Sequence, residues 1–414
     1  MRGEINGDAI RTAFPVLPLM KILHLFPDEK KFVIVAAEIF NMCKELENSF
    51  RVISANVSDA QKFFSGQQNI RVVDKRYAAS KALMEDLAWC DCLVVHFMDG
   101  LKAKAILRAP DHLPIVWSGW GGDYFDLLPQ GGSNLLGNET QRLVKTLDRQ
   151  IGWSASKLKQ KMKNIARKIR NEVLYAPLIK KAIKRVDYFS SPFPEDFDLL
   201  RAHLGNDFHP AYTRIFYGSV ERTYVPGVES VYGNNILVGN SATATNNHLE
   251  VFKILSKLDL GDRKIVVPLS YGDVDYRDAI ISYGRALFGD RFQPIVEFMP
   301  LDQYNTLIAQ CSVVVMGHRR QQGGGNTVTQ LYKGAKVFLD EANTVYQYLK
   351  NRGAFVNTLN ELQVCGPSVF EPLTDAQKRK NREVLEDYAS NEVVLAGVRD
   401  FVQQIRSHGV SEHA

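Results

Sequence analysis

Short apolar runs alternate with longer segments of helical periodicity along most of the chain. In the first half these runs are rich in β-branched and aromatic residues and are bounded by turn residues, which predicts strands at Lys21–Phe26, Asn69–Asp74, Cys92–Met98 and Pro114–Ser118. The second half repeats the rhythm, with strands predicted at Asn235–Gly239, Lys264–Leu269, Ile295–Phe298, Ser312–Met316 and Lys336–Leu339. Strands that are apolar throughout are typical of parallel sheets covered on both faces. The pattern therefore predicts two open α/β sheets.

A turn-rich stretch separates the two halves. Tyr224–Asn235 holds one proline, two glycines and two asparagines, which suits an interdomain linker. Two domains also suit a chain of 414 residues, since single cores stop growing near about 250 to 300 residues. We therefore expect an N-terminal extension, two domains and closing helices, at residues 1–19, 20–230, 231–374 and 375–414. The partner of the closing helices, expected around Asp375–Tyr388 and Glu392–Gln404, is left open.

The composition is that of an ordinary globular protein, with 45% apolar and 23% charged residues. No apolar run reaches the roughly 18 to 20 residues that a bilayer-spanning helix needs, and the start of the chain lacks a signal-peptide core. The five cysteines are odd in number and lack zinc-like pairing. We therefore expect reduced thiols and a cytoplasmic protein.

Positive charge is concentrated in one segment. Between Arg142 and Arg185 there are fourteen Lys and Arg against two acidic residues, a local charge of +12 in a chain whose net charge is +5, so the remainder carries about −7. This segment falls in a basic insertion expected at about 130–185. Its apolar residues recur at helical spacing and predict one apolar stripe, formed by Ile151, Leu158, Met162, Ile165, Ile169 and Val173.

Such a helix, with Trp153 near its start, suits an anionic membrane surface, where each basic residue contributes about 1 kcal/mol. The alternative is a surface helix whose stripe packs on its own domain and whose charges are solvated. Nucleic-acid binding is the weaker interpretation, because the segment contains no recognised binding module.

The segment Val313–Gly334 carries the most informative chemistry. It predicts a buried strand, a glycine-rich turn at Gly323–Gly325 and a helix that begins directly after the turn. A helix N-terminus of this kind presents free N–H groups and the positive end of the helix dipole, which suits a diphosphate. Arg319 and Arg320 precede the turn and add permanent positive charge. The structural alternative is a tight strand-to-helix turn, which also favours glycine.

Two common nucleotide-binding fingerprints are missing. The first predicted strand is followed by Leu25–Asp28 without a GxGxxG pattern, and no GxxxxGK[ST] occurs, which argues against dehydrogenase and P-loop classes. Instead, Ile236–His248 runs from a strand into a turn of small hydroxyl and amide residues, at the strand end where open α/β sheets bind ligands. The alternative is a helix cap formed by Asn246 or Asn247.

In the first half, Val116–Tyr124 places Asp123 after a strand and two glycines, beside the two tryptophans of the sequence VWSGWGGDY. A carboxylate near indole rings suits a general base with a raised pKa, and the rings suit stacking on a sugar; a helix cap is the alternative. His96 and His24 each lie at a strand and are expected to face the same cleft, although a lone histidine is more often structural.

These segments together resemble a known family. The segments GWGGDYF, VGNSATATNNH, VVPLSYG, the helix containing Tyr304 and RRQQGGGNT occur in the same order in the bacterial TDP-Fuc4NAc:lipid II Fuc4NAc transferases, also called 4-α-L-fucosyltransferases, which build enterobacterial common antigen. The resemblance covers about Lys21 to Gly353. The segment Gln130–Ile169 looks like an insertion relative to shorter members, and the GGGNT turn departs from the GIGT-like turn of the family.

The resemblance implies a GT-B fold, with two Rossmann-like domains facing across a cleft. It implies a nucleotide sugar, with dTDP as the expected nucleotide, a lipid-linked or surface-glycan acceptor, no metal cofactor, and a peripheral place on the cytoplasmic face of the inner membrane. The donor side would hold Gly239, Asn240, Ser241, Asn246, His248, Pro268, Tyr271, Tyr304, Arg320, Gln321, Gln322, Gly323, Gly325, Asn326 and Thr327. The acceptor side would hold Trp120, Gly121 and His24, with Asp123 or His96 as the catalytic base.

We therefore expect sugar transfer, in which the acceptor hydroxyl attacks the anomeric carbon while Arg320 and the glycine turn stabilise the leaving diphosphate. Two rivals remain: a nucleotide-sugar 2-epimerase, which needs no acceptor, and a non-catalytic scaffold of the same fold, which would bind no nucleotide.

Overall fold

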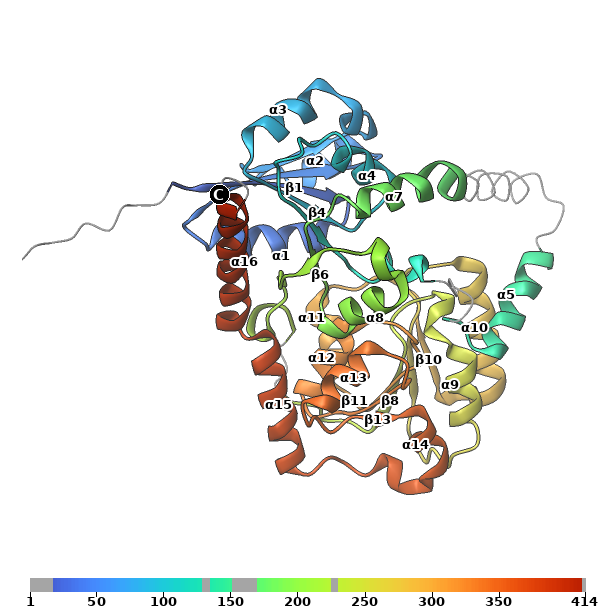
Figure 1. Cartoon of the computed structure of the whole chain (residues 1–414). Coiled ribbons are helices and arrows are strands. Elements are labelled where there is room, and N and C mark those ends of the chain that lie inside the picture. The colour runs from blue at the N-terminus through green and yellow to red at the C-terminus, as the bar shows by residue number, and fades with distance from the viewer. Residues whose placement is uncertain (1–17, 129–134, 151–169, 225–229, 412–414) are drawn as a thin grey trace, which may run out of the picture.

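The computed structural model describes residues 18–128, 135–150, 170–224 and 230–411. In these ranges the chain forms two parallel sheets, each flanked by helices (Figure 1). The first sheet has the order β3-β2-β1-β4-β5-β6-β7, and the second has the order β10-β9-β8-β11-β12-β13. The predicted pair of open α/β sheets is therefore confirmed.

The first sheet is built from the N-terminal half of the chain. Its strands are β1 Met20–Pro27, β2 Leu46–Ile53, β3 Ile70–Val73, β4 Cys92–His96, β5 Ile115–Ser118, β6 Tyr188–Ser190 and β7 Ala211–Tyr212. Its α-helices are α1 Lys30–Asn41, α2 Val57–Phe63, α3 Lys81–Trp89, α4 Gly100–Ile106, α7 Ala176–Ile183 and α8 Pro194–Leu204. The strand order reverses between β1 and β4, so a ligand crevice is expected at the carboxyl ends of these strands.

The second sheet follows the same plan. Its strands are β8 Asn235–Val238, β9 Ile265–Pro268, β10 Phe292–Ile295, β11 Cys311–Met316, β12 Lys336–Leu339 and β13 Asn357–Thr358. Its α-helices are α9 His248–Leu255, α10 Val274–Phe288, α11 Leu301–Ile308, α12 Gly324–Tyr332, α13 Thr344–Asn351 and α14 Leu359–Val364. Here the order reverses between β8 and β11, and the loops after these two strands carry the predicted donor residues.

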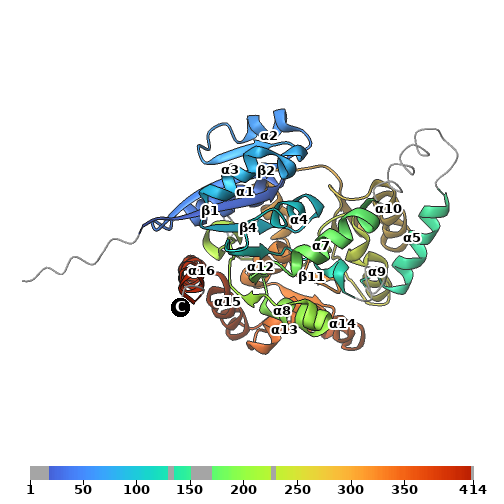
Figure 2. The same cartoon turned by 45° about the horizontal axis from the view of Figure 1, so that its top comes forward.

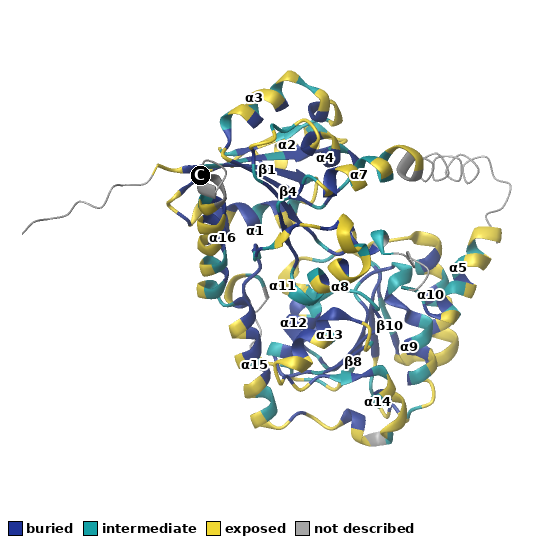
Figure 3. Cartoon of the chain, viewed as in Figure 1, coloured by how far each residue is buried: buried dark blue, intermediate teal, exposed yellow. Residues whose placement is uncertain are grey.

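Helices on both faces explain the apolar character of the central strands. Every residue of β4 and β9 is buried, and Figure 3 shows the strands dark blue while the outer faces of the helices are exposed. Burying one large aliphatic side chain contributes about 1.5 to 3 kcal/mol, so these strands contribute much of the folding free energy.

Two strand predictions need correction. The strand predicted at Ile295–Phe298 was wrong, because β10 is Phe292–Ile295 and the side chain of Phe298 is 87% exposed. Pro294 interrupts the pattern of β10, and it is accommodated because β10 is an edge strand. Strand β2 was missed because its residues alternate between buried and more exposed positions, as in LENSFRVI, and lack an apolar run.

The closing helices connect the two domains. Helix α15 (Asp375–Ala389) packs on α12 of the second domain, and α16 (Asn391–Ser411) reaches α1 of the first (Figure 1). The hydroxyl of Tyr388 donates to the carbonyl oxygen of Pro192 at 3.1 Å, and Arg406 donates to that of Pro18 at 3.1 Å. The closing helices, whose packing partner could not be predicted from the sequence, therefore pack on both domains.

The segment after β5 crosses from the first domain to the second. Helix α5 (Asn138–Gln150) packs on α9 and α10, and Figures 1 and 2 both place it beside these helices. Leu143 of α5 is buried in the apolar core of the second domain. The expected assignment of 130–185 to the first domain is therefore wrong for α5, whose apolar face is covered by the second.

The chain returns to the first domain at η4 (Arg170–Tyr175) and at α7, which packs on α4. Most of the predicted amphipathic stripe, and Trp153, lie at 151–169, outside the described residues. In the described part of the chain, none of the helices is long and apolar enough to cross a membrane.

Candidate active site

The loop after β5 and the loop after β11 meet between the two domains. Gly121 has a φ of 93°, and a Cβ atom there would lie 2.5 Å from the side-chain oxygen of Gln321 and 2.9 Å from its carbonyl oxygen. Only glycine allows this approach, because both the backbone conformation and the space exclude a side chain. The predicted acceptor loop thus contacts the predicted donor loop directly.

A buried amide network supports the donor side. Asn246 is fully buried, and its side-chain oxygen accepts hydrogen bonds from the backbone N–H of Asn240 and from Nε2 of His318, both at 2.8 Å. Nε2 of His318 also lies 3.1 Å from Oδ1 of Asn240. Because both partners are amide oxygens, we infer that Nε2 carries the proton of a neutral imidazole. Burial holds the pKa of His318 well below its ordinary value, which keeps the ring neutral.

The network extends to the surface of the cleft. Gln322 donates to Oγ1 of Thr243 at 3.0 Å, and its side-chain oxygen accepts from Thr245 at 2.6 Å. Asn240 donates to the hydroxyl of Tyr271 at 3.0 Å, and the side chain of Tyr271 is 59% exposed. The loops after β8, β9 and β11 are therefore joined by side-chain hydrogen bonds into one polar surface.

Helix α12 begins at this surface. Gly323 caps the helix with a φ of 64°, and no side chain caps the N-terminus by a hydrogen bond. The unsatisfied N–H groups and the dipole of a helix start favour an anion. Asn326, in the first turn, donates to the hydroxyl of Tyr304 at 2.8 Å, and Thr327 is buried.

The two arginines of the loop differ in their surroundings. Nε of Arg319 lies 3.4 Å from Oδ2 of Asp340, and its Nη1 donates to the carbonyl oxygen of Leu136 at 3.3 Å, so Arg319 is held by the protein. Arg320 is half-buried, with Nη1 donating to the carbonyl oxygen of Gln321 at 3.0 Å. Its position beside Gly121 and before the α12 N-terminus places a permanent charge at the domain interface.

Comparison with known proteins decides the class. Residues 222–364 match the family model described as 4-alpha-L-fucosyltransferase, glycosyl transferase group 56. Over these residues the chain matches glycosyl transferase group 56. The matched range contains the loops after β8, β9 and β11, together with α12. The predicted family is confirmed, and the chain is a glycosyltransferase.

Solved structures similar to the transferase share its fold. Sucrose-phosphate synthase from Thermosynechococcus elongatus superposes with a TM-score of 0.63 at 9% identity, covering 94% of this chain and 99% of that one. HepE from Anabaena, in complex with UDP and glucose, superposes with a TM-score of 0.58 at 11% identity, covering 93% of this chain and 100% of that one. A putative UDP-N-acetylglucosamine 2-epimerase from Listeria monocytogenes superposes with a TM-score of 0.50 at 13% identity, covering 93% of this chain and 95% of that one. The predicted GT-B fold of the transferase is confirmed.

Asp123 lies at the predicted acceptor loop of the transferase, and its carboxylate already accepts three hydrogen bonds. Oδ2 accepts from the backbone N–H of Met98 and from the indole N–H of Trp117, and Oδ1 accepts from the N–H of Trp120, each at 2.8 Å. Burial raises the pKa of Asp123, while these three donors oppose that rise. The geometry therefore suits a residue that fixes the loop, and the expected role as a free base does not fit it.

His24 and His96 do not reach the cleft. Both are fully buried, Nδ1 of His24 lies 3.1 Å from Nε2 of His96, and Nε2 of His24 lies 3.2 Å from Asn48. The ring of His96 stacks on Phe26 with centroids 3.7 Å apart. Burial lowers the pKa of His24 to about 3 and that of His96 in the same direction, so both rings are neutral core groups. Their expected acceptor and catalytic roles are corrected accordingly.

The remaining predicted residues fall into two layers. Ser241, His248 and Pro268 are buried beneath the cleft, where His248 bonds to the hydroxyl of Tyr276 at 3.1 Å. A Cβ at Gly239 would lie 2.7 Å from Nε2 of His248, so this glycine lies directly on the buried layer. The partly or well exposed layer consists of Trp120, Asn240, Tyr271, Tyr304, Arg320, Gln321, Gln322, Gly323, Gly325 and Asn326.

Sequence reasoning missed two buried groups at the site. His318 follows the end of β11, and its position after a predicted strand was the available signal. Asp196, in the first turn of α8, bonds across the interface to Thr344, a long-range pairing that no pattern in the sequence indicates. Among the described residues, no group of three or more His, Cys, Asp or Glu side chains is arranged to hold a metal ion.

Proposed function

We propose that the transferase holds the diphosphate of a nucleotide sugar at the start of α12, with Arg320 beside it. The observation that carries the proposal is the uncapped helix N-terminus behind Gly323, together with an arginine at the domain interface. The positive end of the helix dipole and a guanidinium both favour phosphate oxygens. The UDP in the HepE complex supports a nucleoside diphosphate as the ligand class, and family membership supports dTDP and a Fuc4NAc-like sugar.

In the proposed reaction, an acceptor hydroxyl attacks the anomeric carbon of the donor sugar and gives its proton to water. The bond from this carbon to the diphosphate oxygen breaks, and the electron pair leaves with the nucleoside diphosphate. Arg320 and the first N–H groups of α12 then stabilise the developing charge, and this scheme assigns no step to a metal cofactor. We assign Asp123 to holding the Trp120–Gly121 loop at the acceptor side.

We also propose that a lipid-linked or surface glycan is the acceptor and that the transferase binds the inner membrane peripherally from its cytoplasmic side. The described part of the basic segment supports this placement. Val173 and Leu174 are 64% and 58% exposed, and Lys180 and Lys181 of the nearby helix α7 and Lys184 directly after it are exposed as well. Exposed apolar side chains beside lysines suit an anionic lipid surface.

The experiment supplies labelled dTDP-, UDP- and GDP-sugars with lipid-linked glycans extracted from bacterial membranes. We expect one donor to transfer its sugar to the lipid fraction only when acceptor is present. Arg320→Ala should lower transfer by about 10²- to 10³-fold, as for loss of one oxyanion donor. Arg285→Ala, at an exposed position of α10, is the matched control. Sugar that is epimerised without acceptor, or full transfer by Arg320→Ala, would contradict the proposal.

A further inference from the structure

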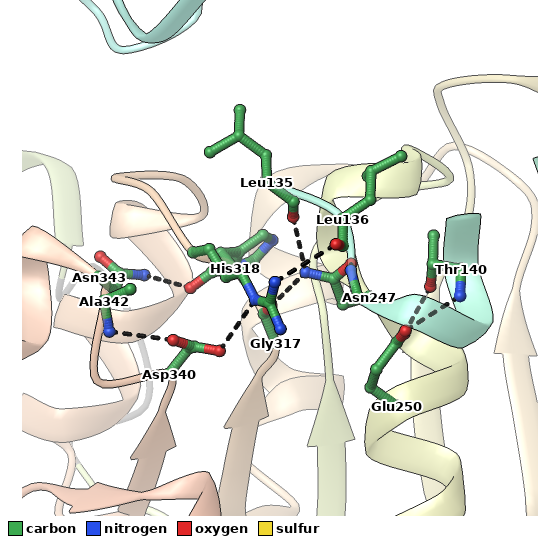
Figure 4. A network of polar contacts seen from close by, with 12 residues as sticks. Leu135, Leu136, Thr140, Asn247, Glu250, Gly317, His318, Asp340, Ala342 and Asn343 are labelled. Atoms are coloured by element: carbon green, nitrogen blue, oxygen red, sulfur yellow. Dashed lines mark hydrogen bonds and ion pairs between the residues drawn. The ribbon is translucent and has the colours of Figure 1, made fainter. Parts of the chain in front are cut away.

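Three consecutive residues before α5, Leu135, Leu136 and Gly137, are hydrogen-bonded either to the loop that carries the arginines or to Asn247 beside it. Asn247 is 98% buried and stands between the two segments: its Nδ2 donates to the carbonyl oxygen of Leu135 at 3.0 Å and to that of Gly317 at 2.7 Å. Its Oδ1 accepts from the N–H of Gly137 at 2.9 Å. Leu136, between them, accepts from Arg319. Figure 4 shows these contacts converging on the end of β11.

The same loop is fixed from its other side. Asn343 donates to the carbonyl oxygen of His318 at 3.0 Å, and Asp340 pairs with Arg319. Residues Gly317, His318 and Arg319 are therefore each bound by a different partner. Buried polar groups that are satisfied in this way rigidify a segment, because breaking any one bond leaves an unpaired group.

Helix α5 fixes this segment to the second domain. The backbone N–H of Thr140 donates to Oε1 of Glu250 at 3.0 Å, and its hydroxyl donates to Oε2 at 2.5 Å. A Cβ at Gly137 would lie 2.1 Å from Oε1 of Glu250, so a side chain there would displace the Glu250 carboxylate that binds Thr140. A double hydrogen bond to a carboxylate is charge-assisted and directional.

The two ends of this crossing segment reach the same tripeptide. Gly121 contacts Gln321 and lies near Arg320, while Leu136 binds Arg319. The arginine loop is therefore held between two parts of one segment that starts in the first domain. We propose that Leu135–Gly137 and Asn247, here called the clasp, position the Arg319–Gly323 loop to receive the β-phosphate of the donor. This inference rests on the proposed function.

Preorganisation explains why a transferase would use such a clasp. A loop fixed before the ligand binds loses no conformational entropy on binding, and its charges need not reorient during the reaction. Asn247 and Thr140 act through the loop and touch no substrate in this proposal, so they are positioning residues. Their loss should weaken recognition of the terminal phosphate and spare recognition of the nucleoside.

The test uses Asn247→Asp and Thr140→Val in the full chain. Asn247 has a φ of 51°, which aspartate tolerates, and the change removes both donations to Leu135 and Gly317. Thr140→Val keeps the shape and removes the hydroxyl that bonds Glu250. The control is Thr146→Val, since the hydroxyl of exposed Thr146 donates within α5 to the carbonyl oxygen of Arg142.

Two readouts are made: amide hydrogen exchange of residues 317–323 without ligand, and the ratio of dissociation constants for a nucleoside diphosphate and its monophosphate. We expect faster exchange in both Asn247→Asp and Thr140→Val and a diphosphate affinity about ten-fold weaker, equal to about 1.4 kcal/mol, with monophosphate binding unchanged. Unchanged exchange overturns the clasp. Faster exchange with an unchanged ratio of the two dissociation constants overturns the link between the clasp and the β-phosphate. A wild type without preference for the diphosphate contradicts the proposed function instead, and the exchange data still decide the clasp.

Discussion

Asp196 and Thr344 join the two domains through a buried hydrogen bond, in which Oγ1 of Thr344 donates to Oδ1 of Asp196 at 2.6 Å. The hydroxyl of Tyr124, one residue after Asp123, donates to Oδ2 at 2.6 Å. Burial raises the pKa of Asp196 to about 7, although both hydroxyls and the charge of Arg320 oppose this rise. One carboxyl group therefore links the predicted acceptor loop to the second domain.

This group makes stability depend on pH. The folded chain keeps the proton of Asp196 up to about pH 7, while the unfolded chain releases it near the ordinary pKa of 3.8. The stabilisation that this proton gives to the folded state is therefore complete below about pH 4 and is lost as pH rises through 7. Asp196→Asn should flatten this fall, measured as the midpoint of thermal unfolding between pH 4 and 8. Asp198→Asn, on the exposed face of the same helix, should not. Equal slopes in both variants would refute the assignment.

Asp123→Asn tests whether this residue fixes the loop or removes a proton. The amide keeps the shape but turns one accepting oxygen into a donor that faces other N–H groups, at a cost of about 1 to 3 kcal/mol for a buried unsatisfied group. We expect a lower free energy of unfolding in urea. We also expect residual transfer with an unchanged acidic limb of its pH–rate profile. A fully stable variant that loses this limb would restore Asp123 as the base.

Gly239→Ala and Gly289→Ala separate backbone strain from crowding at the site. Their φ values are 69° and 54°, so an alanine at either position is strained by its positive φ. At Gly289 no atom lies within 4 Å of the new Cβ, whereas at Gly239 it would lie 2.6 Å from Oδ1 of Asn246. Gly239→Ala should therefore unfold more easily by about a further 1 to 3 kcal/mol and bind nucleoside diphosphate more weakly. Matching effects in the two variants would argue against the buried network.

The sequence pattern predicted much of the fold because buried parallel strands are continuously apolar. Strands β1, β4, β8 and β11 were found within a few residues for that reason. The pattern did not reveal β2, which is partly exposed, or β7 and β13, which have two residues each. It also did not reveal that α5 docks on the other domain, because the partner of an apolar stripe is a tertiary property.

The candidate site was predicted at the level of loops but less well at the level of side chains. Strand ends at a switch point meet by topology, so the positions of Asn240, Arg320 and Gly323 followed from chain order. Chain order did not predict which side chains are exposed: His24 and His96 point into an aromatic core, where Phe50 stacks on His24 and Phe26 on His96. Whether a polar residue faces the cleft or the layer beneath it depends on neighbours that are distant in sequence.

The central claim, that the loop at Arg320 and Gly323 binds the donor diphosphate, is tested most directly by calorimetric titration with dTDP, UDP, GDP and ADP. We predict that one of them, with dTDP expected from the family match, binds the wild type and Arg285→Ala equally, and binds Arg320→Ala at least about ten-fold more weakly, a difference of about 1.4 kcal/mol. Absence of binding by all four to the wild type, or equal affinity in Arg320→Ala, would contradict the claim.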